Sequence, residues 1–228
     1  MSDNPDVAAT LSCLATIRRL SGRFREAEAL HRRSLTITEA VFGPTSPESA
    51  VARKDLAADH NAQGQYKKAI LLLNPDAEVW DKAPPSSRAD MLNILGLAQH
   101  GLGQHEDAAR QISAALRVRR EILAPDHPKL AEGLSNLALV KTSLGEFTEA
   151  QALIEESLSI VVGYFGPGHP LESHIRRIYA HLLETTGRKK ESRAMLQKAV
   201  DIEHGQQRGY TVDVQELYGA SRKERGVR

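Results

Sequence analysis

The chain is poor in aromatic residues, cysteine and long apolar runs. Aromatic residues make up 4% of its 228 residues, as expected where small side chains mediate helix contacts. Cys13 is the single cysteine, which excludes an internal disulfide and fits a reducing compartment. No apolar run approaches the roughly 18 residues of a membrane-spanning helix, and the N-terminus lacks the core of a signal peptide. We therefore expect a cytoplasmic protein with no membrane partner.

Excess charge of one sign is also missing. The formal net charge is +1, whereas a nucleic-acid-binding domain is expected to be strongly basic. Local basic clusters occur near the N-terminus (Arg18, Arg19, Arg23, Arg25, Arg32 and Arg33) and in the tail (Arg222, Lys223, Arg225 and Arg228). No aromatic residues that could stack on bases interleave these charges. We interpret both clusters as solvated ends and expect no nucleic-acid partner.

The main feature of the sequence is an internal repeat. Five glycines recur at intervals of 42, 39, 42 and 42 residues: Gly22, Gly64, Gly103, Gly145 and Gly187. Seven residues before each glycine stands a small residue, and one position earlier stands a large apolar one. Prolines lie 17 residues before four of the glycines, and Pro85 misses that register by one. Proline suits the first turn of a helix, and glycine ends a helix in the left-handed conformation. Each unit therefore predicts helix, glycine turn, longer helix and loop.

The unit resembles a known repeat. The loop Leu123-Ala124-Pro125-Asp126-His127-Pro128 and the segment Gly145-Glu146-Phe147-Thr148-Glu149-Ala150 are similar to the 42-residue tetratricopeptide repeats of kinesin light chain and its bacterial relatives. Over residues 4 to 204 the resemblance implies an all-α fold, a right-handed α-solenoid of about five helix-turn-helix repeats plus a C-terminal helix. The expected repeats are about 4–43, 46–82, 85–124, 127–166 and 169–204. Residues 205–228 are expected to form a capping helix and a basic tail.

Two irregularities interrupt the pattern. The second repeat is three residues short, and Pro75 falls inside its second helix, where proline removes a hydrogen bond. We expect that helix to break near Leu73 and to resume as a short piece carrying Val79 and Trp80. Either Trp80 fills the gap or a notch opens beside it. Near the end, we expect residues 205–209 to break the pattern before a final helix over residues 210–225.

The N-terminal end has no polar capping helix, although the ends of a solenoid need a cap over their apolar faces. Asn4 and Pro5 already occupy the place of the loop motif that precedes later repeats. Three interpretations stay open. The first helix is itself polar enough, or the chain pairs through this end into a homo-oligomer, or it was cut from a longer array. We favour the last two.

The resemblance also indicates where a partner binds, because the first helices of such repeats line a concave groove. It implies a non-enzymatic scaffold for protein–protein interaction that holds a peptide or partner protein and needs no cofactor. Asn136 is the first candidate for contact with a peptide backbone. The groove register also includes Lys54, Asp55, Ser135 and Thr142, and the full set of candidate partner-binding residues is Asn61, Asp90, Asn93, His100, Glu132, Asn136, His174, Arg177, His181 and Glu184.

The rival hypotheses are a self-assembling module and a small-molecule or metal-dependent activity in the groove of repeats three to five. His174, His181 and Glu184 share one helix face, with His100 facing them across the groove in this hypothesis. However, seven residues separate the two histidines by roughly 10 Å along a helix, too far for two ligands of one zinc ion. His181 and Glu184 have a suitable spacing but need further ligands. We therefore predict no metal or catalytic residues.

Overall fold

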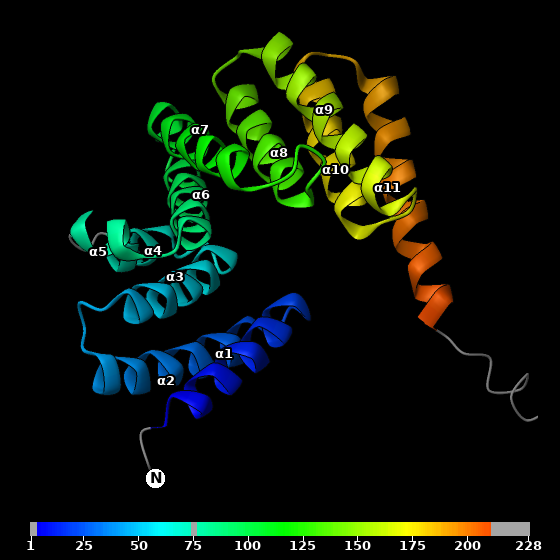
Figure 1. The fold of residues 1–228 in the computed structure, drawn as a ribbon. Helices are drawn as coiled ribbons and strands as arrows, with labels where there is room; N and C mark the ends of the chain where they lie inside the picture. Colours follow the sequence, from blue (N-terminus) through cyan, green and yellow to red (C-terminus); the bar gives the residue numbers. More distant parts are fainter. Residues whose placement is uncertain (1–3, 74–76, 211–228) are drawn as a thin grey trace, which may run out of the picture.

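The protein is a curved array of antiparallel helix pairs, described by a computed structural model for residues 4–73 and 77–210 (Figure 1). Each repeat begins with a first helix of 16 or 17 residues: α1 (Pro5–Leu20), α3 (Pro47–Ala62), α6 (Pro85–Gly101), α8 (Pro128–Ser143) and α10 (Pro170–Thr185). The second helices are α2 (Phe24–Phe42), α4 (Tyr66–Leu73), α7 (His105–Ile122), α9 (Phe147–Phe165) and α11 (Lys189–Tyr210). A short helix, α5 (Ala77–Lys82), follows α4. The all-α repeat architecture expected from the sequence is confirmed.

The prolines and glycines of the repeat lie at the helix boundaries, as the sequence predicts. Every first helix starts with its proline, and the side chains of Asn4, Ser46, His127 and His169 accept a backbone N–H at the helix start. The five turn glycines all have φ between 71° and 79°, a conformation that strains any residue with a Cβ atom. His127 and His169 are therefore helix N-caps.

Small residues allow the two helices of a repeat to approach closely. Ala15, Ala57 and Ala138 are fully buried at the position seven residues before the turn glycine. In the third repeat this position is Gly96, where a Cβ atom would lie 2.6 Å from the side chain of Ile112. Larger residues would therefore push the paired helices apart.

The second repeat breaks as expected. Helix α4 ends at Leu73, and α5 carries Val79 and Trp80. Trp80 is 4% exposed and belongs to an apolar cluster with Leu73 and Met91. The indole thus fills the space that a longer second helix would occupy.

The expected break near the end is wrong. Helix α11 runs from Lys189 to Tyr210 without interruption at Gly205. A single glycine costs a helix only about 1 kcal/mol relative to alanine, which neighbouring residues can offset. The helix therefore crosses the predicted boundary at residue 205, and the final helix predicted over 210–225 lies almost entirely outside the described residues. No described helix is long and apolar enough to cross a membrane.

Candidate functional site

Residues of the first four repeats line a half-open cavity of about 480 Å³. Its walls come mainly from the first helices α3, α6 and α8, with one residue each from α1, α4 and α7. Five of the ten predicted partner-binding residues line it: Asn61, Asp90, Asn93, His100 and Glu132. Lys54 and Asp55, from the same register, line it as well. The residues of the fifth repeat do not take part in this cavity.

The amides in and behind the cavity are used between repeats. The Asn136 side chain donates from Nδ2 to Oδ1 of Asn93 over 3.1 Å, and the two residues are 6% and 3% exposed. Asn61 donates from Nδ2 to the carbonyl oxygen of Ile94 over 2.7 Å. Its Oδ1 atom is buried without a hydrogen-bond partner among the described residues. Asn136 therefore supports Asn93, which lines the cavity, and Asn61 has an acceptor left unused.

Ser135 and Thr142, from the same groove register, are buried. Their hydroxyl groups donate within α8 to the carbonyl oxygens of Glu132 and Ala138. These two side chains stabilise the helix itself.

One wall of the cavity carries a network of compensated charges. Arg119 of α7 is only 2% exposed, and it donates to Oδ1 of Asp90 and to the carbonyl oxygen of Lys129, each over 2.8 Å. Lys129 in turn lies 3.1 Å from Glu132 and 3.8 Å from Asp90. Because each carboxylate has a cationic neighbour, these two acids are held in place by the protein.

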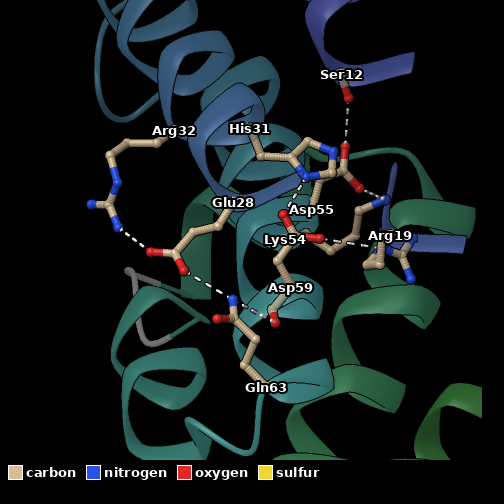
Figure 2. A network of polar contacts seen from close by, with 9 residues as sticks. All are labelled: Ser12, Arg19, Glu28, His31, Arg32, Lys54, Asp55, Asp59 and Gln63. Carbon is tan, nitrogen blue, oxygen red and sulfur yellow. Dashed lines mark hydrogen bonds and ion pairs between the residues drawn. The ribbon is translucent and has the colours of Figure 1, made fainter. Parts of the chain in front are cut away.

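The opposite wall is built on a buried acid (Figure 2). Asp59 of α3 is completely buried, and its carboxylate contacts Nδ1 of His31 at 2.5 Å and Nε of Arg19 at 3.3 Å. Lys54 and Asp55 form a second pair at 3.1 Å, and Ser12 donates to Asp55. Arg19 lines the cavity, so this buried network fixes the position of a guanidinium at the cavity surface.

His100 is the titratable group of the cavity with a shifted pKa. Burial lowers the pKa of His100 first, and the neighbouring His105 and His181 lower it further. The Nδ1 atoms of His100 and His105 lie 3.1 Å apart. His100 is therefore neutral near pH 7 and can both donate and accept a hydrogen bond.

The remaining predicted residues lie further along the groove. Arg177 points to α11, where it forms a two-point ion pair with Glu203 at 2.8 and 3.1 Å. His174, His181 and Glu184 are exposed. The concave surroundings of His174 partly desolvate its ring and lower its pKa, against the opposing effect of Glu132. Among the described residues, no three His, Cys, Asp or Glu side chains are arranged to hold a metal ion.

Sequence reasoning missed Arg19, Arg119 and Lys129. Arg19 stands three residues before its glycine, the register of Asn61 and His100, so extending that register to the first repeat would have found it. Arg119 comes from a second helix, and no first-helix register could indicate it.

Comparison with known proteins agrees with this architecture. The model of the tetratricopeptide repeat matches residues 6–74, 87–160 and 130–202. No curated protein matches the chain.

Solved structures of similar shape include repeats of the same kind. The nearly identical TPR-like repeats of a putative kinesin light chain from Podosopora anserina share 21% identity, cover 91% of this chain and 99% of their own, and superpose with a TM-score of 0.65. BtubC (BKLC) from P. vanneervenii gives 20% identity, 89% and 82% coverage and a TM-score of 0.67. A Rap protein gives 10% identity, 90% and 66% coverage and a TM-score of 0.65. The chain therefore belongs to the tetratricopeptide repeat family, with a fold like that of kinesin light chain repeats.

Proposed function

We propose that this chain is a non-enzymatic interaction module that holds a peptide segment of a partner protein in the cavity between α1 and α8. Tetratricopeptide repeats generally mediate protein–protein interaction. The observation that carries the finer proposal is one cavity lined by four repeats, with hydrogen-bonding side chains from each. Its volume of about 480 Å³ falls in the range of about 300–1,000 Å³ that is typical of ligand pockets.

The groups in the cavity suit a peptide. The unused Oδ1 of Asn61 is an acceptor for a backbone N–H, and neutral His100 can bond to either backbone group. Nε of Arg19 lies 3.3 Å from the Asp59 carboxylate, and the side chain of Arg19 lines the cavity. A guanidinium held in this way binds a carboxylate well. We therefore place an acidic side chain of the peptide beside Arg19.

Two further observations fit this proposal. The Rap protein that shares the fold was solved in complex with Competence and Sporulation Factor, so an array of this kind can hold a ligand. Cys13 is a free, exposed cysteine, which supports placing the interaction in the cytoplasm.

Filling the cavity tests the proposal directly. The full chain would be immobilised and used to select a displayed library of random peptides. Ala58 lines the cavity, and Ala58→Trp places an indole in it. We expect peptides selected by the wild type to bind this variant at least about tenfold more weakly, a loss of about 1.4 kcal/mol.

The matched control is Ala29→Trp, the same substitution at an exposed position of α2. It should retain the selected peptides with unchanged affinity. Circular dichroism and urea unfolding would show that both variants are folded. Equal binding by the two variants would remove the cavity as the binding site.

A further inference from the structure

The first helix of the array carries an uncovered apolar stripe. Val7, Leu14 and Ile17 of α1 are 38%, 38% and 58% exposed, and Leu11 is half-buried between them. Spacings of three and four residues place all four side chains on one face of the helix. No described element of the chain covers this face fully.

The stripe has the register of a helix that packs on a preceding repeat. Its members stand 15, 11, 8 and 5 residues before the turn glycine. In α8 these positions are all aliphatic as well, and they are at most 6% exposed in a cluster with Ile112 and Leu116 of α7: Leu130, Leu134, Leu137 and Val140. The other first helices each have a polar or charged residue in at least one of these positions. Helix α1 thus carries the same kind of apolar surface as α8, and among the described helices none covers it as α7 covers that of α8.

The last described helix, α11, offers the complementary surface. Leu196 and Val200 of α11 stand nine and thirteen residues after Gly187, the positions of Ile112 and Leu116 in α7. Leu196 is 37% exposed and Val200 is half-buried, while Ala199 and Ser192 are buried toward α10. The two apolar surfaces lie on helices at opposite ends of the curved array (Figure 1).

We propose that copies of this chain stack head to tail, with α1 of one copy packed on α11 of the next. The contact continues the interface between α7 and α8 from one molecule into another, with Ile17 against Leu196 as Val140 lies against Ile112. An interface between two different surfaces leaves one free surface at each end. The assembly therefore grows with concentration, and it does not stop at a symmetric dimer.

The test uses two variants of the full chain that each block one surface. Ile17→Glu places a charge on the α1 surface, and Leu196→Glu places one on the α11 surface. Mass would be followed by sedimentation and light scattering over a range of protein concentrations. The wild type should grow beyond 25.0 kDa as concentration rises, and each variant alone should stay at the mass of one chain.

The mixture of the two variants is the decisive measurement. Each variant keeps the surface that the other has lost, so an equimolar mixture should form dimers and nothing larger. Leu71→Glu, at a residue 79% exposed on α4, is the matched control and should assemble as the wild type does. Circular dichroism confirms that all variants are folded.

Two results would overturn the proposal. A wild type that stays monomeric at every concentration would leave the α1 stripe to an additional repeat or to a different protein. If Leu196→Glu alone still dimerises while Ile17→Glu does not, the chain pairs symmetrically through α1. Neither result bears on peptide binding in the cavity, which the Ala58→Trp variant tests separately.

Discussion

Between the first and second repeats, His31 and Asp59 occupy the two positions that Ile112 and Val140 occupy between the third and fourth. Both pairs are buried: the polar residues are 1% and 0% exposed and the aliphatic ones are each 0% exposed. The first pair is a short contact of 2.5 Å, extended by Arg19 to the cavity (Figure 2). The second pair belongs to a purely apolar cluster.

The comparison shows that the same two positions can either stabilise the contact between repeats or position a charged side chain at the cavity. We call the contact between two successive repeats a joint. Apolar side chains stabilise a joint without requiring one exact geometry, whereas a buried ion pair needs near-ideal geometry to offset its desolvation. Between the fourth and fifth repeats the same two positions are again apolar, with Ile154 and Leu182. The polar joint therefore contributes little to net stability, and it fixes Arg19 at the cavity wall.

The largest loss in the free energy of unfolding is expected from an unpaired charge at the apolar joint between the third and fourth repeats. Val140→Asp buries a carboxylate inside an apolar cluster, and an uncompensated buried charge costs about 3–5 kcal/mol. Urea unfolding followed by circular dichroism would measure the loss in the free energy of unfolding. Val140→Ala controls for lost packing and should cost clearly less. Equal losses in the two variants would show that charge burial is not what distinguishes the joints.

A smaller effect is expected when the polar joint is made apolar. Asp59→Val alone leaves His31 and Arg19 without their shared acid, and His31→Leu alone leaves Asp59 with one partner; each should cost about 3 kcal/mol. The double variant should lie within about 1 kcal/mol of the wild type or above it, because apolar replacement of a buried pair is often neutral or stabilising. Additive losses in the double-mutant cycle would contradict this account. In the double variant, peptide binding should weaken even where stability is retained, because Arg19 loses its anchor.

The smallest effect is the contribution of one histidine on the polar side to the pH dependence of stability. His60 of α3 is 3% exposed, and burial lowers its pKa, against the raising effects of Glu28 and the Gln65 side chain; Lys68 and Arg32 lower it further. A histidine with a lowered folded pKa binds its proton more readily when unfolded. Its contribution to stability is therefore complete above the unfolded pKa of about 6.5 and is lost as the pH falls below it.

His60→Gln should flatten the fall in the urea midpoint below about pH 6.5. The matched position in the fourth repeat is Lys141, whose pKa is raised by its hydrogen bond to Glu146. Lys141→Gln should leave the slope in this pH range unchanged. An unchanged slope in His60→Gln would assign the acid sensitivity to other groups.

The sequence predicts the helices more completely than the cavity. Pro47 and Gly64 mark the start of α3 and its following turn because each acts through its own backbone geometry. The prediction of a break at Gly205 was wrong because a glycine costs a helix only about 1 kcal/mol, which by itself is too little to end one. Asn61 and His100, which the register of the first helices indicates, line the cavity, and their role in binding stays a prediction.

Local sequence thus determined the repeat, its turns and the inward register, since these depend on neighbours within one or two helical turns. The tertiary structure decided which inward side chains remain available to a partner. Asn136 is paired with Asn93 across 43 residues, Arg177 with Glu203 across 26, and Arg119 reaches Asp90 from another helix across 29. These contacts depend on how the repeats stack, because a side chain's partner is set by the distance between helices and not by its place in the repeat.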